Sequence, residues 1–164
     1  MSDALVAVSD LFMISRGNKF DLNKMIRARG HEANAVAFVN RSGERNGIAA
    51  FIRDVPGMKP YDAGLITVAL GGSTLSSFVQ PRCFYTGQNV DVLTPKEPMS
   101  FDEELYYCLC IEANRFRYST YGREANRTLR TLPLPARAAV PDWVNGISKT
   151  ALSSLHKDID ALLM

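Results

Sequence analysis

A run of arginines and aromatic rings lies between Arg115 and Thr128, in the stretch RFRYSTYGREANRT. It holds four arginines and three aromatic side chains but a single acid, Glu124. Guanidinium groups bind phosphate oxygens, often through two hydrogen bonds, and flat rings can stack on bases. The stretch therefore predicts contact with a nucleic acid. The alternative is that Phe116 and the tyrosines belong to the core, beside a solvated arginine face.

Two further segments carry side chains suited to DNA. NRSGERNG, residues 40–47, supplies arginine, serine and asparagine, which bond phosphates or base edges. GGSTLSSFVQ, residues 71–80, has small residues that let a backbone approach a phosphate, then a glutamine that could read a base. Either segment could instead be an ordinary polar turn. With one lysine nearer the N-terminus, the candidate DNA-binding residues are Lys19, Arg41, Ser42, Arg45, Asn46, Ser73, Thr74, Gln80, Arg117, Tyr121, Arg123, Asn126 and Arg127.

Patterns for catalysis or metal binding are weak in this sequence. The glycine-rich stretch lacks the lysine of a phosphate-binding loop, and the adjacent acids Glu103 and Glu104 suit the start of a helix. The cysteines have no metal-ligand spacing, so we expect buried structural thiols, including Cys108 and Cys110. The two histidines are too few for a zinc site. We expect no catalytic residue, no cofactor and no metal ion in this chain.

The composition is that of one ordinary domain of 164 residues, 46% hydrophobic and 22% charged. The net charge of +2 does not by itself indicate a polyanionic partner. The charges are nevertheless segregated, with basic clusters at residues 16–29 and 115–130 and acids at 97–104 and 158–160. No apolar run approaches the roughly 18 residues of a membrane span, and no signal-peptide pattern is present, so we expect a cytoplasmic protein that contacts no membrane.

Short strands dominate the first part of the sequence. Apolar runs at residues 35–39 and 48–52 flank a polar loop, which predicts a β-hairpin. The branched run at residues 64–70 predicts a buried strand, and residues 77–80, 83–86 and 89–93 continue the pattern. The opening apolar segment leads to a turn at residues 16–18, and residues 20–26 fit one or two helical turns.

Helices are expected later. Ser100 followed by acids predicts a helix of about four turns from residue 101. Pro133 and Pro135 favour an extended segment over residues 128–136. The sequence thus predicts an α+β fold, with a single domain at 1–145 built of short strands, hairpins and one main helix. An amphipathic helix follows at 146–164, and its apolar stripe is Ile147, Ala151, Leu152, Leu155, Ile159 and Leu162.

The order of these segments resembles the target recognition domain of restriction–modification specificity subunits, both the type I S subunits and the S-like domains of type IIB and IIG systems. The resemblance rests on FVNRSGERNGIAAFI, YDAGLITVALGGSTLSSFVQPRCFYTGQNVDVLTP and RFRYSTYGREANRTLRTLPLP, and covers about residues 5–145. The positions that match the pattern typical of the family are Arg41, Ser42, Arg45, Asn46, Gly72, Ser73, Phe78, Gln80, Tyr121, Gly122, Arg123, Asn126 and Arg127.

The resemblance implies a non-catalytic protein that reads double-stranded DNA and directs a partner methyltransferase, or methyltransferase–nuclease, to its target. The partner would bring S-adenosylmethionine and any Mg²⁺. We expect Arg123, Asn126 and Arg127 to hold the DNA backbone, with Phe116 and Tyr118 packed beneath them.

The arrangement of the C-terminal helix leaves alternatives open. Specificity subunits of this family have two recognition domains separated by long helices, whereas this chain has one domain and a short helix. The chain could form a homodimer through the apolar stripe, could be a module of a larger assembly, or could pack the stripe on its own domain. An interaction or decoy protein that occupies a methyltransferase without reading DNA is the alternative function. A small nuclease would need Mg²⁺-dependent cleavage, for which the sequence offers no support.

Overall fold

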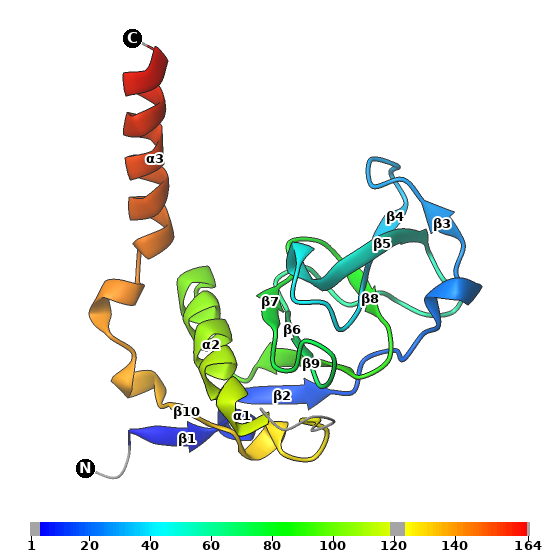
Figure 1. The fold of residues 1–164 in the computed structure, drawn as a ribbon, viewed down its shortest axis with the longest axis horizontal. Helices are drawn as coiled ribbons and strands as arrows, with labels where there is room; N and C mark the ends of the chain where they lie inside the picture. Colours follow the sequence, from blue (N-terminus) through cyan, green and yellow to red (C-terminus); the bar gives the residue numbers. More distant parts are fainter. Residues whose placement is uncertain (1–3, 119–123, 164) are drawn as a thin grey trace.

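The computed structural model describes residues 4–118 and 124–163, and its mixture of helices and short strands confirms the expected α+β fold (Figure 1). One four-stranded antiparallel sheet has the order β2-β9-β6-β7. These strands span Phe12–Ser15 (β2), Val90–Pro95 (β9), Ile66–Ala69 (β6) and Ser77–Val79 (β7). The strands expected from the short apolar runs are therefore present.

The second four-stranded sheet has the order β3-β5-β4-β8. Its strands span Arg27–Ala28 (β3), Ile48–Arg53 (β5), Ala35–Val39 (β4) and Phe84–Thr86 (β8). Strands β4 and β5 pair antiparallel and form the predicted hairpin, while β8 lies parallel to β4 on its other side. Two short 3₁₀ turns lie beside this sheet, η1 at Leu22–Lys24 and η2 at Arg45–Gly47.

Helix α2 (Phe101–Ala113) covers one face of the first sheet. Ser100 caps it as predicted, because the Ser100 hydroxyl accepts from the Glu103 N–H while the Glu103 carboxylate accepts from the Ser100 N–H. Tyr107 and Ile111 of this helix are fully buried in the larger core, against Phe12 and Leu93. Each large side chain buried in this way contributes about 1.5–3 kcal/mol to stability.

The two sheets share a smaller core. Val90 and Val92 of β9 pack with Ala37 and Val39 of β4 and with Phe84 of β8. Because neighbouring side chains on β9 point to opposite faces, this strand contributes to both cores. The sheets are therefore held together by buried apolar contacts.

The two ends of the domain lie side by side. Strand β1 (Leu5–Ala7) pairs antiparallel with β10 (Pro133–Pro135), and a single helical turn, α1 (Val8–Leu11), separates β1 from β2. The opening apolar segment is thus divided into strand, turn and strand. The extended segment expected over residues 128–136 begins only at Pro133, because Leu129–Thr131 form the 3₁₀ turn η4.

Helix α3 (Ile147–Leu163) leaves the body of the protein, as Figure 1 shows. Apolar side chains on it are exposed to solvent, with Leu152 at 67% and Leu162 at 84%. The possibility that the stripe packs on its own domain is therefore wrong. Within the described ranges, no helix has the length and apolar character that a membrane span requires.

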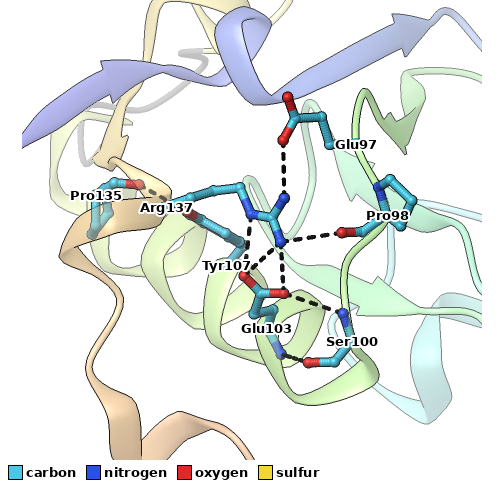
Figure 2. A network of polar contacts seen from close by, with 7 residues as sticks. All are labelled: Glu97, Pro98, Ser100, Glu103, Tyr107, Pro135 and Arg137. Atoms are coloured by element: carbon cyan, nitrogen blue, oxygen red, sulfur yellow. Dashed lines mark hydrogen bonds and ion pairs between the residues drawn. The ribbon is translucent and has the colours of Figure 1, made fainter.

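The segment between β10 and α3 is tied to the start of α2 through Arg137, at the beginning of η5 (Arg137–Ala139). Its guanidinium group bonds the Glu103 carboxylate at 3.1 Å, the Glu97 carboxylate at 3.2 Å and the carbonyl of Pro98 (Figure 2). Beside it, the Tyr107 hydroxyl donates to the carbonyl of Pro135 at 3.0 Å. A final 3₁₀ turn, η6 (Asp142–Val144), then leads to α3.

Candidate nucleic-acid interface

Three of the segments singled out in the sequence meet at one surface. The hairpin tip, residues 40–47, lies against the glycine–serine loop, residues 71–76, since the Ser73 N–H donates to the carbonyl of Arg41 at 3.2 Å. The 3₁₀ turn η3 (Asn114–Tyr118) reaches the same loop through Arg115. This guanidinium group donates to the carbonyl of Thr74 at 3.0 Å and to the hydroxyl of Ser76 at 3.1 Å.

An open groove of about 750 Å³ lies where these segments meet. We call it the tip groove; its lining residues are Gly43, Gly72, Ser73, Thr74, Ser76, Glu112, Arg115, Phe116 and Tyr118. Glu112 is the acid in it, and it is used internally, because its carboxylate accepts from the Ser77 N–H at 3.1 Å and lies 3.9 Å from Arg115. The groove therefore combines backbone, hydroxyl groups, an arginine and an aromatic ring.

The hairpin tip has an unusual backbone. Arg45 and Asn46 have φ angles of 51° and 57°, in the left-handed region that asparagine tolerates and arginine rarely adopts. The tip is held by the Gly47 N–H, which donates to the carbonyl of Glu44 at 2.8 Å. This backbone leaves the side chains of Arg41, Arg45 and Asn46 exposed.

Gly72 has a definite reason to be glycine. Its φ of +65° lies in the left-handed region, and an added Cβ would stand 3.2 Å from both the Cβ and the carbonyl oxygen of Arg41. A larger residue would push the glycine–serine loop away from the hairpin. The close approach of these two segments therefore depends on this position.

Gln80 is not available to read a base. Its side chain is 1% exposed, and its amide nitrogen donates to the carbonyl of Asn46 at 2.7 Å and to the Thr67 hydroxyl at 2.8 Å. The strand that ends at Val79 runs beneath the hairpin, so the glutamine points inward. We correct the expectation accordingly: Gln80 positions the tip backbone and faces away from solvent.

The other predicted residues divide into several groups. Arg41, Ser42, Arg45, Asn46, Ser73 and Thr74 lie on the hairpin tip and the glycine–serine loop. Lys19 is exposed at the edge of the second sheet, where its carbonyl accepts from Gln88. Asn126 lies beside β2 and β9, Arg127 is exposed, and neither lines the tip groove. Tyr121 and Arg123 lie outside the described residues.

The aromatic residues near the tip groove behave differently from one another. Tyr118 packs against the larger core, as expected, and its hydroxyl shares a hydrogen bond with Thr128. Phe116, which we expected to be packed beneath the arginines, is 68% exposed, and that expectation is wrong. Its ring lies 5.0 Å from the guanidinium carbon of Arg117, which also donates to Asn114 at 2.8 Å. An exposed ring beside a groove is a surface on which a base can stack.

Cysteine and metal chemistry does not contribute to this surface. Cys108 is buried, as expected, and burial raises the pKa of its thiol, whereas Cys83 is exposed, against expectation. Within residues 4–118 and 124–163, no three metal-ligating side chains gather. The surface offers guanidinium, hydroxyl, amide and ring groups, which suit binding of a polyanion.

Comparisons with known proteins identify the fold. The chain is 32% identical over 158 residues to S.BcgI, the specificity subunit of a type II restriction enzyme from Heyndrickxia coagulans. The chain is therefore similar to a restriction-enzyme specificity subunit over most of its own length. The match covers 93% of this chain but 45% of that subunit, so the chain spans about half the length of the curated relative. No family model matches the sequence.

Solved specificity subunits share the fold. The type I S subunit of M. genitalium aligns with a TM-score of 0.60 and 11% identity, over 99% of this chain and 43% of its own. A chain from a type I restriction–modification system, solved to explain complex assembly, aligns with a TM-score of 0.62 and 16% identity. This alignment covers 96% of the present chain and 39% of the solved one. The HsdS subunit of Thermoanaerobacter tengcongensis aligns with a TM-score of 0.59 and 16% identity, over 91% of the present chain and 38% of HsdS. The target-recognition-type fold predicted from the sequence is therefore confirmed.

Proposed function

We propose that this chain binds double-stranded DNA in a sequence-specific manner and directs a methyltransferase, or methyltransferase–nuclease, to its target. The observation that carries the proposal is the tip groove, where the hairpin tip, the glycine–serine loop and the end of α2 meet. The chain itself is proposed to be non-catalytic and to act in the cytoplasm. Its relationship to specificity subunits supports this function.

The roles of the tip residues follow from their chemistry. Arg41 and Arg45 are exposed cations on the hairpin, and we assign them to phosphates or to guanine edges. Asn46 is exposed at the turn, its carbonyl is held by Gln80, and its amide suits an adenine edge. The major groove of B-form DNA admits a narrow β-element, and we assign to it the tip of the β4–β5 hairpin, residues 40–47, which extends beyond the paired strands.

Cofactors belong to the partner in this proposal. The methyltransferase would bring S-adenosylmethionine and any Mg²⁺ needed for cleavage, and this chain would bind neither. Direct titration tests this point: isothermal titration of the purified chain with S-adenosylmethionine and with MgCl₂ should give no heat of binding. A saturable signal with either compound would contradict it.

The exposed stripe on α3 is the proposed site of a second copy. The stripe is solvated throughout, and burying each leucine or isoleucine would contribute about 1.5–3 kcal/mol. Two copies of this chain would also approach the length of its curated relative, of which one copy matches 45%. A homodimer would then present two tip grooves to a two-part DNA site, as the symmetry of such dimers requires.

Light scattering tests the homodimer. The chain should elute with twice the monomer mass, and Leu155→Lys, which places a charge at a residue 54% exposed in the monomer, should give a monomer of unchanged circular dichroism. Lys157→Ala on the same helix is the matched control and should remain a dimer. A wild-type chain that stays monomeric at high micromolar concentration would contradict this contact.

DNA binding is tested with the purified chain and its methyltransferase on selected and random duplexes. Arg45→Ala at the tip should weaken binding and lower the slope of log affinity against log salt by about 1, because one phosphate contact is lost. Arg53→Ala is the matched control: Arg53 is exposed at the far end of β5, and its loss should change neither the affinity nor the salt slope. Absence of duplex binding at low salt, with the methyltransferase present, would contradict the proposal.

A further inference from the structure

A second pocket lies between strands β2 and β9 and the segment of residues 126–130. Its volume is about 350 Å³, within the range of small-ligand sites, and we call it the β9 pocket. Its accessible apolar lining is Met13, which is 58% exposed, and the partly buried Ile14. The pocket is distinct from the tip groove, with which it shares no lining residue.

Asp91 gives this pocket its unusual chemistry. The residue is 2% exposed, lines the pocket, and has an Oδ1 atom with no hydrogen-bond partner among the residues that the structure describes. Burial raises the pKa of this carboxyl group, while the positive charges of Arg16 and Lys19 act in the opposite direction. An acceptor withdrawn from water without a donor is unfavourable, so a donor from outside the chain would relieve it.

Asn126 supplies a second acceptor. Its amide nitrogen donates to the Glu124 carboxylate, which fixes the orientation of the amide group. Its Oδ1 is buried, lines the same pocket as Asp91, and also lacks a partner within the described part of the chain. Two oxygen acceptors thus line one pocket and call for a ligand that carries N–H donors.

The charges around the pocket restrict that ligand further. Arg16, Lys96 and Arg130 line it with positive charge, and Asp91 is the single acid among its lining residues. A metal ion or an ammonium group would satisfy the acceptors but would be repelled by these cations. An inorganic anion would suit the cations but would meet the lone pairs of the acceptors. A ligand with N–H donors at one end and an anion at the other suits both.

We propose that the β9 pocket binds one nucleotide whose base carries an exocyclic amino group. The base rests on Met13 and Ile14, the amino group donates to the oxygens of Asp91 and Asn126, and the 5′-phosphate lies against Arg16 and Arg130. A free nucleotide and an unpaired nucleotide of a DNA strand share this chemistry. The site does not depend on duplex reading by the hairpin tip.

Isothermal titration of the full chain with dGMP, dCMP, dAMP and TMP tests the preference. The three amino-bearing nucleotides should bind about tenfold more tightly than TMP, which has no exocyclic amino group, since a hydrogen bond to a charged acceptor is lost. Arg130→Gln should weaken binding of the nucleoside monophosphates about tenfold and leave binding of the corresponding nucleosides unchanged. Arg53→Gln, an exposed arginine of the other sheet, is the matched control.

Asp91→Leu separates binding from folding. Leucine has a similar size and removes the unpaired carboxyl, so thermal stability should stay equal or rise while nucleotide binding falls at least tenfold. Should this variant fail to fold, Arg130→Gln still decides the matter. Equal binding of all four nucleotides, or unchanged binding by a folded Asp91→Leu variant, would overturn the proposal.

Two DNA probes distinguish a free nucleotide from an unpaired nucleotide of a DNA strand as the natural ligand. A duplex with one bulged cytidine and the fully paired duplex are titrated against wild type and Asp91→Leu. If Asp91→Leu loses affinity for the bulged duplex alone, the natural ligand is an unpaired nucleotide of DNA. If mononucleotides bind but the variant keeps its affinity for the bulged duplex, the ligand is a free nucleotide. Either outcome supports the pocket. Arg45→Ala should leave mononucleotide binding intact, so failure of duplex reading and failure of this pocket give different results.

Discussion

The carboxylate of Asp102, in the first turn of α2, accepts a hydrogen bond from the backbone N–H of Gly146 at 2.7 Å. Its other oxygen accepts from the N–H of Ser148 at 3.3 Å. These N–H groups belong to the start of α3, which has no preceding turn to satisfy them. One side chain of the body thus caps the helix that leaves it. We expect the direction of α3, and with it the placement of any second copy, to depend on this contact.

Asp102→Ala should loosen the base of α3 without unfolding the domain. Because the start of α3 then loses its cap, tryptic cleavage at Lys149 should accelerate several-fold, as followed by mass spectrometry. Asp160→Ala, on the exposed face of α3, is the control and should cleave at the wild-type rate. Equal rates for the two variants would show that the contact does not fix the helix.

The same contact should depend on pH. The hydrogen bond from the Ser148 side chain, followed by those from the N–H groups of Gly146 and Ser148, lowers the pKa of Asp102 despite the opposing effect of burial. A lowered folded pKa means that the stabilisation is complete above the usual value of 3.8 and is lost as pH falls through the folded value. The amide proton of Gly146 should therefore keep its hydrogen-bonded chemical shift down to pH 4 and lose it below.

Glu104 should make the protein less stable as pH rises. Burial, followed by the charge of Glu103, raises the pKa of Glu104 to about 7. Between about pH 4.5 and pH 7, a carboxyl group with a raised pKa keeps its proton in the folded state but loses it in the unfolded state. The stability of the protein therefore falls as pH rises through this range. Glu104→Gln should raise the urea midpoint at pH 8 and leave it unchanged near pH 4. A difference of the same size at both pH values would contradict this assignment.

Arg137→Lys should destabilise the domain although the charge is kept. The guanidinium group bonds Glu103 and Glu97 and the carbonyl of Pro98, a geometry that a single ammonium group cannot reproduce. We expect a loss of about 1–3 kcal/mol in the free energy of unfolding, measured by urea denaturation. Arg53→Lys, on an exposed strand end, should stay within about 0.5 kcal/mol of wild type. A loss no larger than that control would mean that the network contributes little.

Gln80→Leu should weaken DNA binding without changing sequence preference. Leucine leaves the carbonyl of Asn46 and the hydroxyl of Thr67 without their donor, which costs about 1–3 kcal/mol and frees the hairpin tip. Affinity for selected and altered duplexes should fall by a similar factor, measured by fluorescence anisotropy. A loss of affinity that depends on one base pair of the target would instead show that Gln80 contacts the DNA.

The local elements were readily predicted from the sequence. The hairpin follows from two apolar runs around NRSGERNG, and α2 follows from Ser100 and the acids after it, because both signals lie within a few residues of the element. The relationship to specificity subunits likewise followed from the order of segments, which the 32% identity to S.BcgI supports.

The orientation of individual side chains could not be predicted in this way. Gln80 sits at the end of a strand and was expected to face DNA, yet Asn46, 34 residues earlier, draws it inward. Phe116 follows a helix and was expected in the core, yet the turn η3 leaves it in solvent. The β9 pocket was also missed, because Asp91 and Asn126 are brought together by a contact between β9 and a distant loop. Such placements arise from tertiary packing, which no short window contains.

The pairing of β1 with β10 has a topological consequence. Since Leu5 and Pro135 are opposite each other, the polypeptide enters and leaves the folded body at one place, and the elements from α1 to η4 form a closed loop between these two points. A loop with adjoining ends can be spliced into another chain, repeated in tandem or rejoined in permuted order without disturbing its interior. The pairing therefore makes β1 to β10 a unit that joins the rest of the polypeptide at one place, with Arg137 and Asp102 supplying its contacts to the segment that follows.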